Sequence, residues 1–173
     1  MICPHCGHEN IAGADVCDEC LQSLVDHGVS PASSHVERRI LENPVTALKP
    51  APPVAVRPDQ PLQEVLSLMV ERRIGCVLVV ERDEIVGIFS ERDALMKIGD
   101  RAAQLSQEPI GDFMTPNPEC VDADASIAFA LHKMDVGGYR HLPVVDSRGR
   151  PTGVISVRNV LAFLTQEYAL AEE

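Results

Sequence analysis

Apolar positions follow two similar patterns from Pro44 onward. In each pattern a short apolar stretch precedes four apolar residues at helical spacing, and two more apolar stretches follow, separated by a charged turn. A serine then opens a second helical pattern, over 90–98 in the first copy and 156–164 in the second. The residues at helical spacing are Leu62, Val65, Leu66 and Met69, and then Ile127, Ala130, Leu131 and Met134. The apolar stretches are 54–56, 76–80 and 85–89, and then 120–121, 142–145 and 152–155. Each copy therefore predicts the order strand, helix, strand, strand, helix, which is typical of an α/β fold.

Matched positions indicate that the two patterns are copies of one unit. Pro53 and Pro118 lie 65 positions apart, and Gly87 and Gly153 lie 66 apart. The added residue falls in the turn at 147–150, where a one-residue insertion is tolerated. We therefore expect two similar structural units, packed against each other about a pseudo-twofold axis.

The chain divides into four segments by composition. Within the second of them, Ser33 or Ser34 is expected to cap a short helix over 36–42. The predicted segments are 1–27 with four cysteines, 28–42 as linker and short helix, 43–107 as the first repeat and 108–173 as the second.

Charge and hydropathy exclude several classes of protein. The net charge of −11 over 173 residues argues against binding to a phosphate backbone, so we expect no nucleic-acid partner. No apolar stretch approaches the roughly 20 residues that span a bilayer, and the N-terminal residues do not resemble a secretory signal. We therefore expect a cytoplasmic protein that makes no membrane contact, in a compartment where structural disulfides are rare.

Two Cys-x-x-Cys pairs predict a metal centre near the N-terminus. Cys3 and Cys6 form the first pair, Cys17 and Cys20 the second, and ten residues separate the pairs. Four thiolates complete a tetrahedron around Zn²⁺, and a segment this small needs such a cross-link to fold. Iron in the same cage is the main alternative; disulfides or thiol redox chemistry are further ones. A closed four-cysteine site leaves no open position for catalysis.

The cysteine segment resembles the short zinc-ribbon family, which binds nucleic acids or proteins. The matching residues are Cys3-Pro4-His5-Cys6-Gly7 and Cys17-Asp18-Glu19-Cys20. No Lys or Arg occurs before Arg38, whereas Glu9, Asp15, Asp18, Glu19 and Asp26 are all acidic, so the charge favours protein docking or a purely structural role. With iron in the cage, the segment would instead be a rubredoxin-like electron-transfer appendage.

Three segments carry a more specific resemblance, to the cystathionine-β-synthase (CBS) domain. They are Gly87-Ile88-Phe89-Ser90-Glu91-Arg92-Asp93, Phe113-Met114-Thr115-Pro116 and Arg140-His141-Leu142-Pro143-Val144-Val145-Asp146. The resemblance covers about 43–165 and implies a tandem CBS-domain pair, or Bateman module. It also implies an adenosyl ligand such as AMP or ATP, held between the repeats as a signal rather than as a cofactor. Assembly as a homodimer through the CBS pairs is a further implication.

The resemblance implies a first ligand site at Ser90 and Asp93, beside Ile88. A carboxylate suits ribose because two adjacent hydroxyls can both donate to it. A serine at a helix N-terminus suits a phosphate or a ribose oxygen. The family builds its sites across both repeats, which implies that Thr115, Tyr139, Arg140 and His141 complete this one. Two structural alternatives stand beside this interpretation: Ser90 and Asp93 also form a capping box, and Arg140 with His141 also suits a solvated loop.

A second site is implied at Ser156 and Asn159, with Val54, Ile74 and Gly75. Asn159 stands where the motif has an aspartate. Because an amide carries no charge, we expect the second site to be weaker, altered or empty.

These observations favour a non-catalytic protein that senses an adenosyl ligand and docks a protein partner through its ribbon. Two alternatives remain open: a dimerising adaptor without ligand, and an electron-transfer protein with iron at the four cysteines. An enzyme has little support, because the sequence shows no paired catalytic carboxylates, no Ser/His/Asp arrangement and no phosphate-binding glycine loop.

Overall fold

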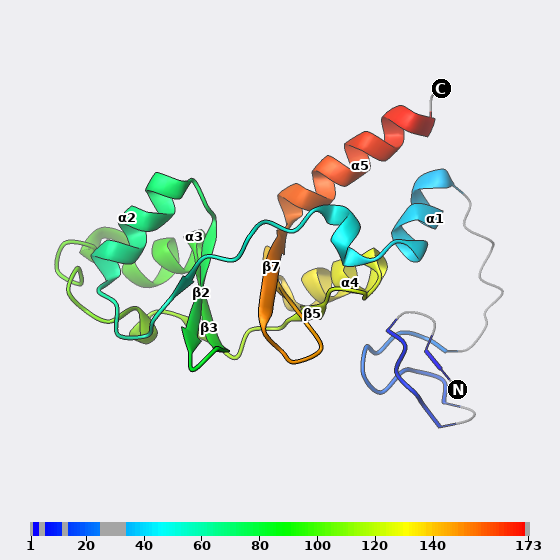
Figure 1. Ribbon diagram of the computed structural model, residues 1–173, viewed down its shortest axis with the longest axis horizontal. Coiled ribbons are helices and arrows are strands. Elements are labelled where there is room, and N and C mark those ends of the chain that lie inside the picture. Colours follow the sequence, from blue (N-terminus) through cyan, green and yellow to red (C-terminus); the bar gives the residue numbers. More distant parts are fainter. Residues whose placement is uncertain (1, 4–5, 12–13, 25–33, 172–173) are drawn as a thin grey trace. The chain divides into compact units, whose positions relative to one another are not determined.

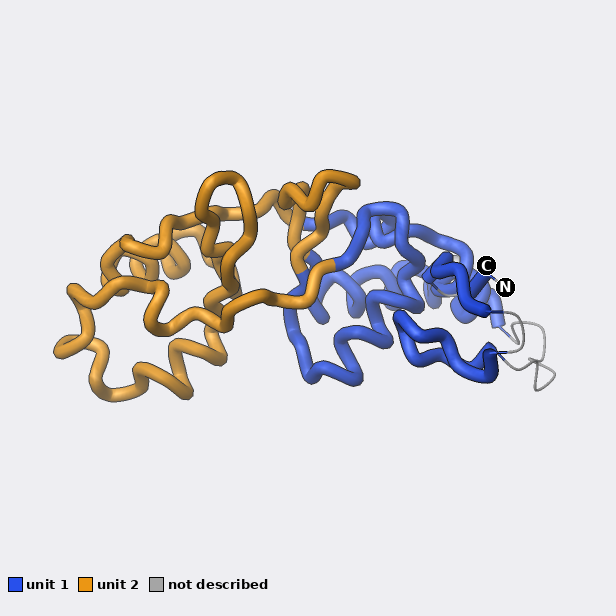
Figure 2. Tube along the Cα trace, turned by 90° about the horizontal axis from the view of Figure 1, so that it is seen from below, with its two compact units in different colours: residues 1–50, 121–142, 155–173 blue, residues 51–120, 143–154 orange. Residues whose placement is uncertain are grey.

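The computed structural model describes residues 2–3, 6–11, 14–24 and 34–171 (Figure 1). The expected linker residues 28–33, including Ser33, lie outside the described residues. The chain forms two compact units (Figure 2). We call residues 1–50, 121–142 and 155–173 the terminal unit, and residues 51–120 and 143–154 the central unit.

The order of elements in each copy agrees with the predicted one. The central unit holds β1 (Ala55–Val56), α2 (Leu62–Arg72), β2 (Cys76–Glu81), β3 (Glu84–Ser90), α3 (Glu91–Asp93), η2 (Ala94–Ile98), η3 (Gly99–Arg101), η4 (Ile110–Asp112) and β4 (Thr115–Pro116). The terminal unit holds α1 (His35–Glu42), η1 (Val45–Leu48), β5 (Val121–Asp122), α4 (Ile127–Gly137) and α5 (Val157–Ala171). Two strands, β6 (His141–Val145) and β7 (Pro151–Ser156), contribute residues to both units. The α/β prediction is confirmed.

Two sheets organise these elements, with the strand orders β1-β2-β3-β4 and β5-β6-β7. In the first sheet β1 runs parallel to β2, whereas β2 with β3 and β3 with β4 are antiparallel. The parallel pair needs a crossover connection, and helix α2 provides it. Figure 1 shows α2 in green beside the β2–β3 hairpin.

Strand β2 is buried on both faces, which explains why its sequence is a continuous apolar run rather than an alternating one. Val77 and Val79 pack in one cluster with Phe89 and the apolar side of α2. Leu78 lies on the opposite face, in a second cluster with Val154. Successive side chains on a strand point to opposite faces, so each cluster takes every second residue.

Helix α2 forms where the apolar spacing predicts it. Leu62, Val65 and Met69 are buried and lie on one side of the helix. The helix ends at Arg73, whose φ of 54° is left-handed and whose N–H donates to the carbonyls of Met69 and Val70.

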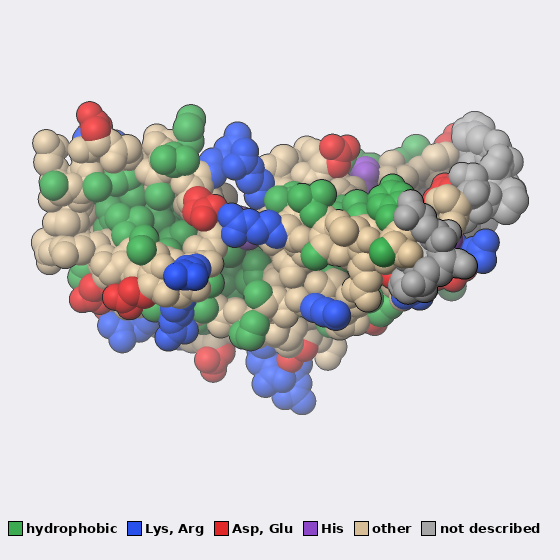
Figure 3. Space-filling view, turned by 90° about the horizontal axis from the view of Figure 1, so that it is seen from above, with side chains coloured by type: hydrophobic (Ala, Val, Ile, Leu, Met, Phe, Trp, Pro, Cys, Tyr) green, Lys and Arg blue, Asp and Glu red, His purple; other side chains and the backbone are tan. Residues whose placement is uncertain are grey.

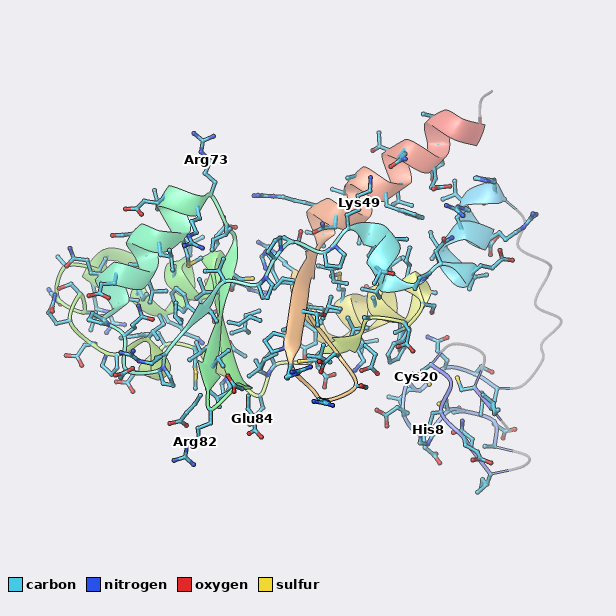
Figure 4. All side chains as sticks on the ribbon, in the orientation of Figure 1. His8, Cys20, Lys49, Arg73, Arg82 and Glu84 are labelled. Carbon is cyan, nitrogen blue, oxygen red and sulfur yellow. The ribbon has the colours of Figure 1, made fainter. Side chains whose placement is uncertain are left out.

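A two-residue turn joins β2 to β3. Arg82 and Asp83 have φ values of 51° and 66°, the left-handed pair that a type I′ turn requires. Glu81 pairs with Glu84 at the base of this turn. Arg82 and Glu84 are labelled there in Figure 4. The right-handed twist of the hairpin imposes this conformation even though neither turn residue is glycine.

In the terminal unit, α1 and α5 are joined by an ion pair. Arg39 donates from Nε and Nη2 to the two carboxylate oxygens of Glu167, at 3.0 and 3.3 Å. Ser34 caps α1 by accepting from the Glu37 N–H at 3.1 Å, which confirms one of the two predicted caps. No helix in the described part of the chain is long and apolar enough to cross a membrane.

The helix expected over 90–98 differs from the prediction in its geometry. A single α-helical turn, α3, gives way to the π-helical turn η2. A π-helical turn is wider than an α-helical one and is frequent at functional sites. In the second copy the corresponding helix α5 is regular and continues to Ala171, past the predicted end at residue 164.

The core assignment predicts unequal costs for two truncations in α2. Leu62→Ala removes a fully buried side chain and is expected to lower the free energy of unfolding by about 2–5 kcal/mol. Val70→Ala, on the exposed side of the same helix, is the matched control and is expected to change it by no more than about 0.5 kcal/mol. Urea denaturation followed by circular dichroism measures both, and equal losses would contradict this core.

Candidate functional site

The four N-terminal cysteines converge on one point. Their Sγ atoms all lie within 4.8 Å of one another, with 3.6 Å between Cys3 and Cys20 and 3.6 Å between Cys6 and Cys17. Three of the four are buried and Cys6 is half-buried. Four thiols at this spacing can hold one metal ion, so the predicted cluster of ligands is confirmed while the identity of the metal remains a prediction.

Two turns with the same geometry position the thiols. The N–H of Gly7 donates to the carbonyl of Cys3, and the N–H of Leu21 to that of Cys17, each at 2.9 Å. Gly7 has a φ of 75°, and Leu21 adopts the equivalent φ of 59° although it is not glycine. The second pair therefore forms the same turn without the glycine that favours it.

A buried asparagine supports the cluster. Asn10 donates from Nδ2 to the His8 carbonyl at 3.0 Å and to Cys17 Sγ at 3.5 Å, and its Oδ1 accepts from the Asp18 N–H at 2.9 Å. Burial raises the pKa of Cys17, but hydrogen bonds from the Cys20 backbone and then from Asn10 outweigh it and bring the pKa to about 6. The thiolate is the form that binds a metal. His8, labelled with Cys20 in Figure 4, is exposed and is not one of the clustered ligands.

The cysteine segment contacts helix α4 through His132. The ring nitrogens of His132 lie 2.9 Å from Gln22 Nε2 and 2.9 Å from the Cys20 carbonyl. A carbonyl only accepts, so Nε2 carries the hydrogen, and the neutral ring then accepts at Nδ1 from the Gln22 amide. One thiol-bearing residue is thereby linked to the second repeat.

The first predicted ligand site is organised around the carboxylate of Asp93. Oδ2 accepts from the Ser90 N–H at 2.9 Å and from the Ser90 hydroxyl at 2.6 Å. Oδ1 accepts from the Thr115 hydroxyl at 3.0 Å and from the Lys97 ammonium at 2.8 Å. The capping box considered as an alternative is present. Ligand binding by the same residues remains a prediction.

The Lys97 ammonium also holds the segment that precedes β4. It donates to the carbonyls of Phe113 and Met114 at 2.8 and 3.1 Å, and it lies 3.3 Å from Thr115 Oγ1. Burial raises the pKa of Asp93, but hydrogen bonds from Lys97, Ser90 and Thr115 outweigh it and hold this pKa below its usual range. The carboxylate is therefore charged at neutral pH.

The second copy repeats this arrangement with an amide. Ser156 donates from its N–H and hydroxyl to Asn159 Oδ1, at 2.9 and 2.7 Å. Asn159 Nδ2 in turn donates to the carbonyls of Leu48 and Lys49, at 3.2 and 3.1 Å. Lys49 is labelled at the end of η1 in Figure 4. These two carbonyls occupy the positions 65 residues before Phe113 and Met114, so the repeats share one pair of acceptors.

The remaining predicted residues divide between the two units. Ile88 lies on β3 and pairs with Thr115 on β4, so it belongs with Asp93 in the central unit. Tyr139, Arg140 and His141 lie in the terminal unit, between α4 and the start of β6. Val54, Ile74 and Gly75 lie in the central unit, whereas Ser156 and Asn159 lie in the terminal unit. Sites composed across the two units stay predictions.

No sequence pattern predicted the contacts of three residues at these sites: Asn10, Lys97 and His132. Lys97 follows Asp93 by four positions, a spacing that also suits an ordinary ion pair on a helix surface. His132 meets Gln22 across 110 positions of sequence, and no local pattern indicates such a pairing. Asn10 lies between the cysteine pairs as one polar residue among several.

Charged side chains form no single large field on the face that Figure 3 shows. Acidic and basic side chains are interspersed there with uncharged atoms. Together with the net charge of −11, this distribution gives no support to a nucleic-acid interface.

Known proteins resemble this chain along the repeats. The family model for the CBS domain matches residues 45–100 and again 110–166. The CBS domain-containing protein CBSCBSPB1 of Arabidopsis thaliana is 35% identical over 105 residues, which are 61% of this chain. The chain spans only 19% of the length of that plant protein.

Solved structures share the fold. The CBS-domain containing protein ATU1752 from Agrobacterium tumefaciens has a TM-score of 0.63 at 28% identity, over 69% of this chain and 98% of that one. The CBS domain protein PAE2072 from Pyrobaculum aerophilum, solved in complex with AMP, has a TM-score of 0.61 at 26% identity, over 73% of this chain and 98% of that one.

The family match begins after the four cysteines, so the metal centre rests on the geometry of its thiols. Proteins with CBS domains are generally regulatory and non-catalytic, which agrees with the prediction that this chain is not an enzyme. Two matched copies cover most of its length, and the chain therefore belongs to the CBS domain family, as a tandem pair.

Proposed function

We propose that the chain is a regulatory module that senses an adenine nucleotide at the site around Asp93. One observation carries the proposal: the Asp93 carboxylate is charged and is held in place by hydrogen bonds from Ser90, Thr115 and Lys97. A fixed carboxylate suits the two adjacent hydroxyls of a ribose. The AMP complex of PAE2072, at 26% identity, supports an adenine nucleotide as the ligand class.

The second copy provides the comparison for this site. Asn159 takes the place of Asp93 and donates from its amide to two carbonyls, so it offers neither a charge nor an idle donor. We therefore infer that the site at Ser156 and Asn159 binds a nucleotide more weakly than the first, or not at all. We also propose that Tyr139 contacts an adenine ring and that Arg140 and His141 contact a phosphate.

Substitution of Asp93 by asparagine tests the sugar contact. Asp93→Asn copies the second repeat and keeps an acceptor for Ser90, so the fold is retained. Hydrogen bonds to a charged group contribute about 1.5–3 kcal/mol, so we expect AMP to bind Asp93→Asn at least tenfold more weakly in isothermal titration calorimetry. In the wild type, 2′-deoxy-AMP should bind more weakly than AMP, and this difference should shrink in the variant.

The control for this experiment is Asp59→Asn. Asp59 is an exposed carboxylate of the same unit that forms an ion pair with Arg57. This variant should bind AMP as the wild type does. Unchanged AMP affinity in Asp93→Asn would overturn the proposal, and a wild type indifferent to AMP would favour the dimerising adaptor.

We further propose that the four cysteines bind structural zinc. Four sulfur donors with no fifth ligand among the clustered residues fit a closed tetrahedral site. The link from the Cys20 carbonyl to His132 would let the metal stabilise the contact with α4 as well as the cysteine segment.

Metal analysis tests the zinc proposal. Purified protein should be colourless and contain one zinc per chain, and Cys17→Ser should lose the metal and unfold the segment, because the thiolate ligands supply its folding energy. Cys120→Ser, outside the cluster, is the matched control and should retain one zinc. A red protein with iron in its place would establish the electron-transfer alternative.

The surface of the cysteine segment supports a docking role, in which it binds a protein with an apolar centre and a basic rim. Its exposed apolar residues are Ile2, Ile11, Val16 and Leu21. Its exposed acidic residues are Glu9, Asp15, Asp18 and Glu19; Asp26 lies outside the described residues. Exposed apolar groups within an acidic surface are typical of a protein contact.

Assembly as a homodimer is the last part of the proposal. Leu95 and Leu161 are equivalent residues of the two copies, 66 positions apart, and both are exposed. Solvent exposure of the same large apolar side chain in both copies supports a symmetric interface formed by the helices that follow β3 and β7.

Charge substitutions test the dimer. In sedimentation velocity the wild type should be a dimer, and Leu95→Glu with Leu161→Glu should be monomeric, because each buried carboxylate would lack a partner. Val70→Glu is the control: Val70 is equally exposed, but its counterpart in the second copy is Asp135. A double variant that remains dimeric would exclude this interface.

A further inference from the structure

Every acceptor position of the Asp93 carboxylate is already occupied within the protein. Two hydrogen bonds from Ser90 end on Oδ2, while Thr115 and Lys97 donate to Oδ1. An ionised carboxylate offers about four lone-pair sites. Each ribose hydroxyl that donates to Asp93 must therefore displace one donor that is present now.

Lys97 is the donor that can leave at the lowest cost. The Ser90 contacts belong to the capping box that starts α3, and Thr115 lies on β4, which is paired with β3. The Lys97 side chain is 38% exposed and flexible, so its ammonium can turn away from Asp93 while it keeps its contacts with the carbonyls of Phe113 and Met114. Because the Asp93 side chain is 12% exposed, water screens this ion pair in part, and breaking it has a moderate cost.

The second copy shows what Lys97 does for the backbone. There, Asn159 alone accepts from Ser156 and donates to the carbonyls of Leu48 and Lys49. An aspartate cannot donate, so in the first copy Lys97 supplies the hydrogens for the carbonyls of Phe113 and Met114. The residue equivalent to Lys97, 66 positions later, is the buried Phe163, whose side chain has no hydrogen-bond donor.

We propose that Lys97 sets the nucleoside affinity of the Asp93 site by occupying one position from which a sugar hydroxyl would donate. The proposal rests on the proposed function, because it requires Asp93 to hold a ribose. The first site is then closed by a side chain that a ligand can displace, whereas the second is closed by the Asn159 side chain that also accepts from Ser156. Lys97 thus acts on affinity by competition for Asp93.

Adenosine is the suitable probe for this competition. It presents the ribose hydroxyls without a phosphate, so the loss of the Lys97 charge does not alter the attraction of an anion. Lys97→Met has nearly the same length and makes no donation to Asp93. Lys97→Gln also lacks the charge but keeps an amide that can donate to the carbonyls of Phe113 and Met114.

Calorimetric titration with adenosine should show both variants binding about fivefold more tightly than the wild type, the gain expected when one partly exposed ion pair no longer competes. Arg92→Met is the control, because it removes a positive charge from an exposed position in the preceding turn, α3, and should bind as the wild type does. If Lys97→Met loses its cooperative thermal transition, Lys97→Gln decides the question.

Unchanged or weaker adenosine binding by the variants would overturn this inference, since Lys97 would then only hold the backbone in place. The proposed function would survive that result if AMP still bound the wild type and lost affinity in Asp93→Asn. Absence of adenosine and AMP binding from wild type and variants alike would overturn both proposals.

Discussion

Two backbone carbonyls in each repeat need a hydrogen-bond donor, and the helix that follows the hairpin provides it. In the terminal unit the donor is the amide of Asn159, which reaches Leu48 and Lys49. In the central unit Lys97 performs the same task. These contacts join residues 48–49 and 113–114 to the helix of their own copy. Where Lys97 is the donor, position 93 can be a carboxylate. Where position 159 is itself the donor, it must be an amide.

This constraint explains why one repeat offers a charge and the other does not. A carboxylate at position 93 is compatible with the shared acceptors only if a second side chain brings the missing hydrogens. The π-helical turn η2 includes Lys97, whose ammonium reaches both Asp93 and the carbonyls. With Asn159, one residue serves both purposes, and Phe163 is left to fill the core. The two copies thus differ in a related way at two equivalent pairs of residues, Asp93 and Asn159, and Lys97 and Phe163.

The order of elements could be predicted from the sequence because it depends on local spacing. The buried side of α2 and the continuous apolar run of β2 each follow from a short window of residues. The irregular turn at Ala94–Ile98 could not be predicted, because the contact that accompanies it joins Lys97 to carbonyls 16 and 17 positions away. The spacing of Ser90 and Asp93 is local as well, and it predicted the capping box that the structure shows.

The four-cysteine cluster, too, has local features that the sequence predicts and distant contacts that it does not. Cysteine spacing was sufficient to predict which thiols converge, since each Cys-x-x-Cys turn is local. The conformation of Leu21 was not evident, because a left-handed leucine is stabilised by the N–H that it donates to Cys17 rather than by its own preference. His132 was not evident either, because its partners Cys20 and Gln22 are 112 and 110 positions away.

The ion pair between Arg39 and Glu167 has a consequence for the order in which the protein acquires its structure. Its partners are separated by 128 positions, so bringing them together closes a very long loop. All four strands of the larger sheet lie before residue 117. During vectorial synthesis the ribosome therefore releases these strands well before α5 emerges to meet α1. Until then α1 can pack against α4 alone of its two helical neighbours, and its contact with α5 forms last.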